Sequence, residues 1–463
     1  MQTFKNILRD ASVLALSAAI VAPAAMAQET EERENAVAKV LSKVTITATK
    51  KSDVEDVQAV PIAVTAFNAD SLEAQKVRTL EDLSFNAPNV TLTDIGTTKG
   101  AANFAMRGLG VNSSIPSIDP TVGVFIDGIY YGTNNGVVFD MFDLESIELV
   151  RGPQGLLQGR NTTGGAVIIN TGNPTDELVM KGRFAVEAPI EDRGGIATYY
   201  QGTVSGPLIQ DKLNGKIGVY YSDDEGYQKN LFDGSNHGAS ETTILRGALE
   251  FLPTDTLSFL AKIERFDADS DGPSGQNRGL FDRDSFDFSI DEPGFSDAEA
   301  TLATLRTDWD VDFGNGTVTN ILGYREYEST TRSDIDALPA YAFHSGSENE
   351  QEQISNELRY NGRFYGVADI TAGVYYFDQT VKYTEVRNLL GGAVNMHGGG
   401  EQDHTVFGIF GQLDYDFTDK LTGQFGMRYS YEEKGADLYY VIPNAPCSVV
   451  DGTCIPNVSD KDD

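Results

Sequence analysis

The chain has 463 residues, 22% of them charged, and a formal net charge of −34 at pH 7. This acidity excludes nucleic-acid binding, because phosphate backbones are recognised by clustered lysine and arginine side chains. Beyond the N-terminus, no stretch offers the roughly 18 consecutive apolar residues that a membrane-spanning helix needs. Any membrane crossing must therefore be made by a β-barrel, and the acidic residues are expected on solvated loops.

The N-terminus has the pattern of a secretory signal peptide. Lys5 and Arg9 precede an apolar, small-residue run over residues 11–22, and Ala25-Met26-Ala27 supplies an A-x-A cleavage site. We therefore expect residues 1–27 to be a signal peptide, with a buried N-terminal helix as the alternative.

Residues 28–50 form a polar, charged linker that is expected in the periplasm and that ends in a short β-branched segment. This segment reads Val44-Thr45-Ile46-Thr47-Ala48-Thr49. An exposed extended segment can join a partner's sheet as an added strand through main-chain hydrogen bonds. The alternative is that these residues form the first strand of the domain that follows.

Residues 51–173 have a mixed pattern that predicts an α+β domain. Apolar periodicity and turn residues predict a strand, an amphipathic helix, a turn and two further strand regions, in chain order at residues 60–67, 69–83, 86–90, 104–108 and 122–130. The next segment, residues 143–174, combines strand formers with closely spaced glycines, which predicts strand, tight turns and strand. Taken alone, it is equally compatible with a glycine-rich turn of any β-rich domain.

Several elements in a fixed order carry a family resemblance. ESIELVRGPQG begins at Glu145, and GRNTTGGAVIINT begins at Gly159. Upstream lie an F-x-x-R-G step at residues 104–108 and a V-x-x-D-G-V-Y step at residues 124–130, in which Ile129 replaces the usual Val. Over about 125 residues the chain thus resembles the plug domain of a TonB-dependent outer-membrane receptor.

The resemblance implies an α+β plug inside a transmembrane antiparallel β-barrel of about 22 strands. It also implies that a TonB box, formed by Val44, Thr45, Ile46, Thr47 and Ala48, binds the periplasmic protein TonB. In the family, charged residues of the plug motifs lock the plug to the barrel wall. The matching residues are Arg107, Glu145, Glu148, Arg151 and Arg160, with exposed surface charge as the alternative.

By the same resemblance, loops between the plug strands face an extracellular vestibule and contact the ligand. The candidates are Asn112, Ser113, Ser114, Tyr130, Tyr131, Asn134 and Asn135. The two tyrosines offer flat rings for stacking on a chelator or a sugar, or they serve as structural aromatics.

Residues 174–463 change to alternating strands, with apolar side chains on one face and polar side chains on the other. The pattern predicts about eleven strands of near ten residues each. Turn-rich joints near residues 206–213, 252–257, 313–317, 361–367 and 417–421 are short, and polar joints near 223–242, 267–298, 328–350 and 382–403 are long. Short turns are expected in the periplasm and long loops outside the cell.

Eleven strands are half of the expected barrel, and the chain ends in Ser459-Asp460-Lys461-Asp462-Asp463, which does not have a strand pattern. An open half-barrel would expose unpaired strand edges to lipid. The sequence is therefore expected to be C-terminally incomplete, with a two-chain barrel as the alternative.

Three local patterns need separate interpretation. Cys447 and Cys454 are expected to close a small disulfide loop, with free thiols or a metal pair as alternatives. Asp267, Asp269 and Asp271 copy the start of an EF-hand loop, but Arg278 stands where the bidentate glutamate belongs, so calcium binding there would be weak. His397-Gly398-Gly399-Gly400 matches an esterase tetrapeptide, but the chain has no G-x-S-x-G elbow.

The resemblance implies TonB-driven import of a scarce solute, with a ferric siderophore as the first choice and a saccharide or other organic nutrient as the second. The expected partners are TonB, outer-membrane lipid and the small-molecule substrate, for a monomeric protein without a cofactor. A passive porin or an adhesin is the alternative from another class. A surface enzyme is disfavoured, because four scattered histidines and no paired catalytic motif offer little to build on.

Overall fold

The structure is a computed structural model that describes residues 45–51, 55–58, 60–96, 98–113, 115–137, 140–189, 194–440, 444 and 458–462. The predicted signal peptide, Val44, Ser114 and both cysteines, Cys447 and Cys454, lie outside the described residues. Within these ranges, none of the helices has the length and apolar composition of a transmembrane helix.

Residues 45–173 form a small α+β region, which we call the plug region. Its elements are β1 (Thr45–Ile46), β2 (Glu55–Asp56), β3 (Ala63–Asn68), α3 (Ala69–Ala74), the 3-10 helix η2 (Glu81–Phe85), β4 (Val90–Ile95), β5 (Thr98–Met106), β6 (Leu109–Gly110), β7 (Val122–Ile126), β8 (Ile129–Tyr130), β9 (Leu144–Arg151) and β10 (Gly165–Thr171). Strands β3-β9-β10-β7-β8 make one sheet, and β4-β5-β6 make another. The β10–β7 pair is parallel, and the β10–β9 pair is antiparallel.

The core of the plug region follows from the alternation of β9. Ile147 and Leu149 point into the main apolar cluster, while Val150 points into a second cluster on the opposite face. Complete burial of side chains of this size stabilises a fold by about 1.5–3 kcal/mol each. Glu148 shares the face of Val150, because alternate residues of a strand point to the same side, and it is completely buried.

The predicted helix over residues 69–83 is wrong as a single helix. Asn68 caps α3 by accepting a hydrogen bond from the Ser71 amide, but α3 ends at Ala74 and η2 begins only at Glu81. Lys76 between them has φ of 55°, a left-handed conformation that cannot continue an α-helix. Apolar periodicity continues across the break, which explains why the sequence pattern suggested one helix.

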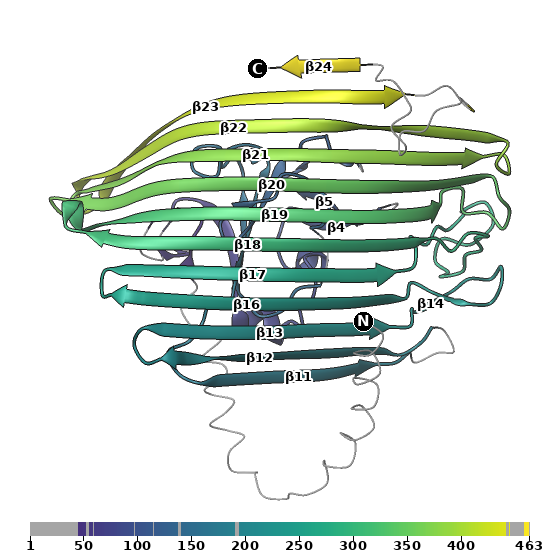
Figure 1. The fold of residues 1–463 in the computed structure, drawn as a ribbon, viewed down its shortest axis with the longest axis horizontal. Coiled ribbons are helices and arrows are strands. Elements are labelled where there is room, and N and C mark those ends of the chain that lie inside the picture. The colour runs from purple at the N-terminus through teal and green to yellow at the C-terminus, as the bar shows by residue number, and fades with distance from the viewer. Residues whose placement is uncertain are drawn as a thin grey trace, which may run out of the picture. The chain divides into compact units, whose positions relative to one another are not determined.

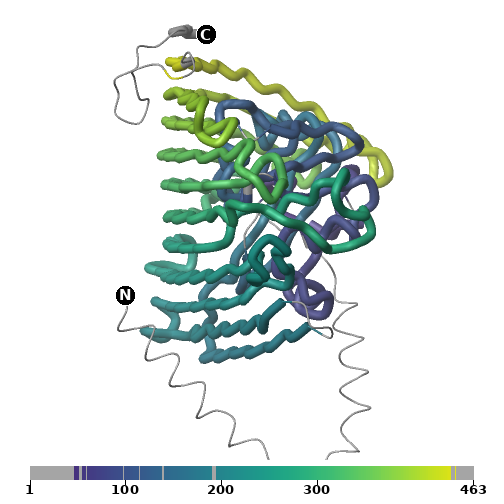
Figure 2. Tube along the Cα trace, turned by 90° about the vertical axis from the view of Figure 1, so that its right-hand side faces the viewer, coloured from purple at the N-terminus to yellow at the C-terminus, as the bar shows by residue number. Residues whose placement is uncertain are grey.

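Residues 179–462 contain a twelve-stranded antiparallel sheet, which we call the wall sheet (Figure 1). Its strands are β11 (Val179–Glu187), β12 (Ala197–Ile209), β13 (Leu213–Asp224), β16 (Ser240–Thr254), β17 (Leu257–Ser270), β18 (Phe295–Val311), β19 (Gly316–Asp334), β20 (Phe343–Phe364), β21 (Ala368–Leu389), β22 (Val394–Thr418), β23 (Leu421–Tyr440) and β24 (Val458–Asp462). The connections hold β14 (Gln228–Lys229), β15 (Asn236–His237) and the 3-10 helix η3 (Phe313–Asn315). Each strand pairs with its neighbours in this order, and the plug region packs on the face turned away from the viewer of Figure 1, as Figure 2 shows from the side.

The two faces of the wall sheet differ as the alternation predicts. Ile217, Phe425 and Met427 belong to the exposed apolar face, and Met427 is 79% exposed. Lys216 and Arg246 lie on the opposite face, against the plug region. An exposed apolar row on long antiparallel strands is the surface that lipid covers in outer-membrane barrels.

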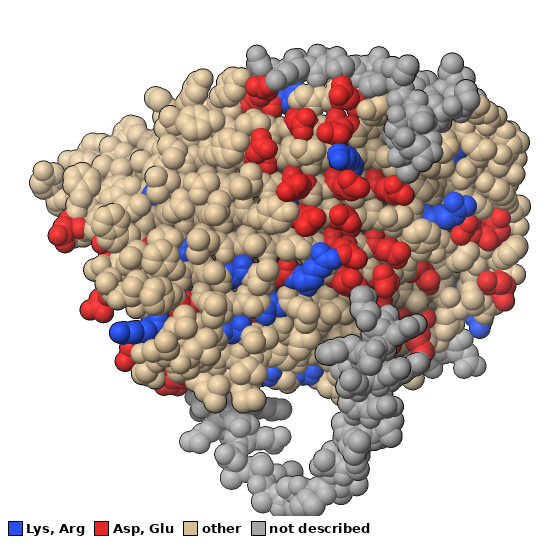
Figure 3. All heavy atoms as spheres, in the orientation of Figure 1, with Lys and Arg blue, Asp and Glu red and all other residues tan. Residues whose placement is uncertain are grey.

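Acidic residues gather on the outward face toward the long connections (Figure 3). The strand register places several of them directly opposite one another, as in the pairs Asp269–Asp297, Glu299–Glu328 and Glu328–Glu350. Like charges at such positions repel each other and cost stability.

Three sequence expectations for the wall need correction. The strands have 9–25 residues except for the short β24, so most are longer than the expected ten or so. The predicted long loop at residues 382–403 is mostly β21 and β22, which meet at the turn of residues 390–393. The C-terminal residues also form a strand, β24, so that the sheet has twelve strands. These polar segments form strands because the backbone of the neighbouring strand supplies hydrogen-bond partners. The amino-acid composition of a segment does not reveal such partners.

Candidate functional site: contacts of the plug region with its N-terminal segment and the wall

A buried carboxylate holds the N-terminal segment. Glu148 Oε1 accepts hydrogen bonds from the backbone amide of Thr47 at 2.7 Å and from its hydroxyl at 2.9 Å. Glu148 Oε2 accepts from the Ala48 amide at 3.0 Å, and Gln158 Nε2 donates to the Ala48 carbonyl at 2.9 Å. We call these four residues the Glu148 clasp. Burial raises the pKa of Glu148, although the hydrogen bonds from Thr47 and Ala48 act in the opposite direction.

The residues that follow the clasp are tied to the wall. Lys50 Nζ lies 2.6 Å from Glu357 Oε2 on β20, and the Lys50 carbonyl accepts from Asn361 Nδ2 at 2.9 Å. Lys51 Nζ lies 3.1 Å from Asp414 Oδ2 on β22. The chain therefore passes from the buried clasp directly to a wall contact.

The predicted TonB box is thus docked, whereas the sequence suggested an exposed segment. Ile46 is 1% exposed and Ala48 is 3% exposed, while Thr47 is exposed. Thr45 and Ile46 pair with Asp56 and Glu55 as a short antiparallel ladder. The physical reason is Glu148, whose buried oxygens require donors that the segment's own backbone supplies.

Acidic residues of the plug region face basic residues of the wall sheet. Asp127 Oδ1 lies 3.0 Å from Lys262 Nζ, which also donates to the Thr171 carbonyl at 2.9 Å. Asp143 Oδ1 lies 2.7 Å from Lys216 Nζ. Asp127 has φ of 49° and Gly128 has φ of 84°, a hairpin turn that projects the carboxylate toward the wall.

Arg160 makes the most extensive of the predicted lock contacts. Its Nη2 lies 2.8 Å from Asp119 in the plug region and 3.0 Å from Glu432 on β23. Its Nη1 donates to His404 Nδ1 at 2.5 Å, so that His404 Nε2 carries the proton and donates to Glu432 at 2.7 Å. Burial opposes the charge of Asp119, but Arg160 and Lys434 hold the pKa of that carboxyl below its usual value.

The other four lock candidates make contacts inside the plug region in the described part of the chain. Glu148 forms the clasp, Arg151 Nη1 donates to the Pro88 carbonyl at 3.2 Å, and Glu145 Oε2 accepts from Asn173 at 3.2 Å. Arg107 packs against Gly152, where an added Cβ would lie 2.9 Å from the Arg107 Nη1 atom. The structure therefore brings Arg160 to the wall and assigns the others to internal contacts.

Four of the predicted ligand-contact residues are buried, which contradicts a position at the plug surface. Tyr130, Tyr131, Asn134 and Asn135 are each less than a tenth exposed. The Tyr131 ring lies 4.3 Å below the Arg325 guanidinium, and Asn135 Nδ2 donates to Asn349 on β20 at 3.3 Å. Wall strands cover this loop, so the two tyrosine rings are packed between the plug region and the wall sheet.

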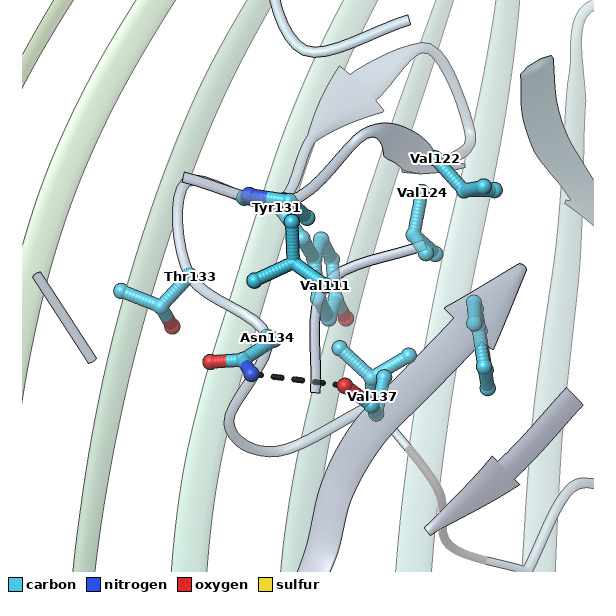
Figure 4. A pocket seen from close by; sticks show the side chains of 10 residues that line it. Val111, Val122, Val124, Tyr131, Thr133, Asn134 and Val137 are labelled. Atoms are coloured by element: carbon cyan, nitrogen blue, oxygen red, sulfur yellow. Dashed lines mark hydrogen bonds between the residues drawn. The ribbon is translucent and has the colours of Figure 1, made fainter. Parts of the chain in front are cut away.

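The remaining members of that set lie nearer the surface. Asn112 is exposed, and the Ser113 carbonyl accepts from Asn134 Nδ2 at 2.7 Å. Tyr131, Asn134 and Val137 line a small cavity of about 10 Å³ beneath this loop (Figure 4). This cavity holds at most one water molecule, so it is not a substrate site.

A larger cavity of about 240 Å³ lies between the plug region and strands β21–β23. Its polar lining includes Arg160, Arg428 and Glu432. Arg428 Nη1 donates to the Leu156 carbonyl at 3.4 Å. This cavity is therefore part of the plug–wall interface.

The EF-hand candidates are not arranged as a calcium loop. Asp267 and Asp269 belong to the extended strand β17, and Asp271 follows it and accepts from the Ala239 amide at 2.9 Å. An extended strand separates alternate residues by about 6.5–7 Å, whereas an EF-hand loop curls its ligands around one ion.

Sequence reasoning missed the wall side of the interface. The residues concerned are Lys216, Arg246, Lys262, Arg325, Gln353, Glu357, Asp414 and Lys434. Each of these wall residues has a charged or amide side chain on the strand face opposite the apolar row. The alternation of polar and apolar residues identifies that face in each strand. The sequence does not show which plug residue each of them meets.

The family model described as TonB-dependent Receptor Plug Domain matches residues 56–166. Residues 56–166 of the chain are therefore a plug domain of the TonB-dependent receptor type. The match lies within the plug that the sequence predicted, and it ends inside β10 of the TonB-dependent receptor plug.

The relatives of this chain include two from Yersinia pestis. The pesticin receptor is 26% identical over 268 residues, which cover 57% of this chain and 37% of the relative. The hemin receptor is 30% identical over 139 residues, which cover 29% of this chain and 19% of the relative. The chain thus spans little more than a third of the length of the pesticin receptor.

Solved structures share the fold. The ferric yersiniabactin uptake receptor of Yersinia pestis matches with a TM-score of 0.73 at 18% identity, covering 87% of this chain and 61% of that one. The ferripyoverdine receptor of Pseudomonas aeruginosa, solved with ferripyoverdine bound, matches with a TM-score of 0.63 at 15% identity, covering 90% of this chain and 56% of that one. At these identities the likeness establishes the fold alone, a plug against a large antiparallel sheet.

Proposed function

We propose that this protein imports a ferric siderophore across the outer membrane and that TonB drives the import by pulling on residues 45–48. The observation that carries the proposal is the Glu148 clasp, which joins a strand-forming N-terminal segment to the sheet of a TonB-dependent receptor plug. The names of relatives and structural neighbours, among them siderophore receptors, support the choice of cargo.

The Glu148 clasp is suited to a segment that is released when TonB pulls on it. Removing the segment would break the hydrogen bonds that the Glu148 carboxylate accepts from Thr47 and Ala48. Hydrogen bonds to a charged acceptor are stronger than neutral ones, so the clasp holds the segment until a pulling force exceeds them. Because Glu148 lies in the middle of β9, a pull on the segment acts directly on the central plug sheet.

The pull would next reach the wall contacts. Lys50 and Lys51 follow the clasp, and their partners Glu357 and Asp414 belong to different wall strands. Breaking one partner of a buried pair is expensive even where the pair itself adds little net stability. The order of the contacts along the chain therefore makes the clasp open before the wall attachment.

A deletion of residues 44–49 tests the proposal. Cells that carry the protein or its deletion variant are given ⁵⁵Fe-loaded catecholate, hydroxamate and phenolate siderophores, and surface binding and uptake are measured separately. We expect one class of siderophore to bind both proteins and to enter only the cells with the intact segment. Uptake that survives the deletion would instead indicate a passive porin.

The cargo has an independent test. The abundance of the protein in outer membranes is measured in iron-starved and iron-replete cells, and we expect a strong rise under starvation. If abundance does not change and none of the iron complexes binds, then the second candidate, a saccharide or another organic nutrient, replaces the siderophore. Energised uptake of such a nutrient would retain the role of residues 45–48.

A further inference from the structure

Three potential metal ligands meet outside the plug–wall interface, at the end of the wall sheet with the long connections. Asp334 ends β19, His344 lies near the start of β20, and Asp291 belongs to the connection before β18. Their ligand atoms all lie within 4.8 Å of one another. Two atoms bound to one ion by bonds of about 2.0–2.4 Å can be no farther apart than about 4–4.8 Å, so the three can share an ion.

The strand register explains why two of these residues meet. Asp334 and His344 are directly opposite partners in the β19–β20 ladder. Directly opposite residues have Cβ atoms about 4.5–5.5 Å apart, so a carboxylate and an imidazole on the same face converge. Asp291 completes the group: its Oδ1 atom lies 3.1 Å from His344 Nε2, a hydrogen bond that a bound ion would replace. That separation matches the edge between neighbouring ligands of a tetrahedral or octahedral ion with bonds of about 2.1 Å.

One oxygen of the group lacks a protein partner. Asp334 is 6% exposed, and its Oδ1 atom accepts from the Ala337 amide at 2.8 Å. Its Oδ2 atom is buried and has no hydrogen-bond partner among the described residues. A buried carboxylate oxygen without a donor is costly, and a bound cation is one of the few ways to satisfy it.

The His344 imidazole is buried, with an aromatic ring on its face and a carboxylate near its second nitrogen. His344 is 4% exposed, and Tyr341 stacks on its ring at 4.1 Å with an interplanar angle of 11°. Glu292 Oε2 accepts from Arg332 Nε at 2.8 Å and lies 4.0 Å from the second ring nitrogen of His344, Nδ1, which is beyond hydrogen-bond distance. Metal-binding histidines usually present the second nitrogen to a carboxylate, which fixes the ring orientation.

We propose that Asp291, Asp334 and His344 bind a divalent transition-metal ion of the zinc class. Calcium and magnesium prefer oxygen ligands alone, whereas imidazole with carboxylates suits zinc and its neighbours in the transition series. Three protein ligands leave at least one coordination position for water. The ion would fasten the connection of residues 271–294 to the ends of β19 and β20. The proposal does not depend on the identity of the transported solute.

The test is zinc binding to the whole protein, purified in detergent and stripped with a chelator. Titration calorimetry with zinc chloride is applied to the unmodified protein, to Asp334→Asn and to His344→Gln. The matched control is Asp284→Asn, which removes an exposed carboxylate from the same connection but lies outside the cluster. We expect one zinc ion per chain for the unmodified protein and the control, and at least a tenfold weaker affinity for the two ligand variants.

A second measurement guards against variants that fail to fold. Limited proteolysis of the unmodified protein follows cleavage within residues 271–294 with and without zinc, and we expect zinc to slow cleavage several-fold. Failure of the unmodified protein to bind zinc, equal binding by Asp334→Asn and the control, or binding of calcium in preference to zinc would each overturn the proposal.

Discussion

At the scale of single residues, Glu148 shows how one buried polar group organises a functional segment. It lies on a strand whose neighbours are apolar, and its carboxylate accepts three hydrogen bonds from Thr47 and Ala48. Hydrogen bonds to a charged acceptor contribute about 1.5–3 kcal/mol each, more than neutral ones. The N-terminal segment is therefore held to the plug by two backbone amides and by the Thr47 hydroxyl.

The change Glu148→Ala is expected to release the segment. Loss of the acceptor should speed hydrogen exchange at the Thr47 and Ala48 amides at least about tenfold, because one such bond is worth about 1.5 kcal/mol or more. Mass spectrometry of exchanged protein in detergent measures this. The control is Glu145→Ala on the same strand, which removes an exposed carboxylate that accepts only from Asn173 among the described residues. Equal exchange in both variants would contradict the clasp.

Asp94, at the end of β4, gives a prediction for pH. Burial, with a smaller contribution from Glu81, raises its pKa to about 6. A carboxyl with a raised pKa stabilises the fold below its unfolded value, near 4, and this stability is lost as the pH rises through 6. We therefore expect Asp94→Asn to raise the apparent melting temperature at pH 7.5 and to leave it unchanged at pH 4. A change of equal size at both pH values would show that charge is not the cause.

At the scale of elements, the wall strands combine a row of exposed apolar side chains, of the kind that lipid covers, with acidic residues near the strand ends. On β16, Leu249 is outward and half exposed, whereas Glu241 lies opposite Asp223 and Asp269. The same strand thus passes from an apolar to a strongly acidic environment within a few residues. Composition alone does not reveal this change, because it depends on the register of neighbouring strands.

Lysine substitutions on β16 should distinguish the two environments. Leu249→Lys is expected to destabilise the folded protein by about 2–4 kcal/mol if the position lies at mid-membrane depth. Glu241→Lys should be neutral or stabilising, because it replaces repulsion by attraction to two acidic neighbours. Urea unfolding in lipid vesicles, followed by gel mobility, measures both. Similar losses for the two variants would refute a lipid-facing row at Leu249.

At the scale of the whole molecule, charge complementarity joins the plug to the wall. Lys262 meets Asp127 and the carbonyl of Thr171 in a buried site, whereas Arg265 on the same strand pairs with Glu299 on the outward surface. The two pairs have the same chemistry but different burial. Only the buried pair bridges the two parts of the molecule.

We therefore expect Lys262→Ala to loosen the plug far more than Arg265→Ala. Breaking a buried pair costs about 3–5 kcal/mol, and an exposed pair contributes about 0–1 kcal/mol. The readout is the urea concentration at which a protease begins to cut the plug, which should fall clearly for Lys262→Ala alone. If both variants shift it equally, the Lys262 contact does not hold the plug.

Most of the fold could be predicted from local patterns. The glycine-rich motif steps, the strands of the plug and the alternation of β13, β16 and β23 are local properties, so the sequence alone determined an α+β plug and a large antiparallel sheet. The prediction from sequence was wrong where the backbone conformation of one residue or pairing with a neighbouring strand determined the secondary structure. The left-handed backbone conformation of Lys76 interrupts the predicted helix. Residues 458–462 form the strand β24 because they pair with the edge of β23.

The candidate site was predictable in part. The sequence alone marked Glu148 and Arg160 as important charged residues, because they stand in recognisable motifs. Only the tertiary structure decided that Glu148 holds Thr47 and Ala48, that Arg160 reaches Glu432, and that Asp334 converges with His344 and Asp291. The physical reason is that each of these contacts joins segments far apart in the chain, and strand register and packing set their distances while local sequence does not.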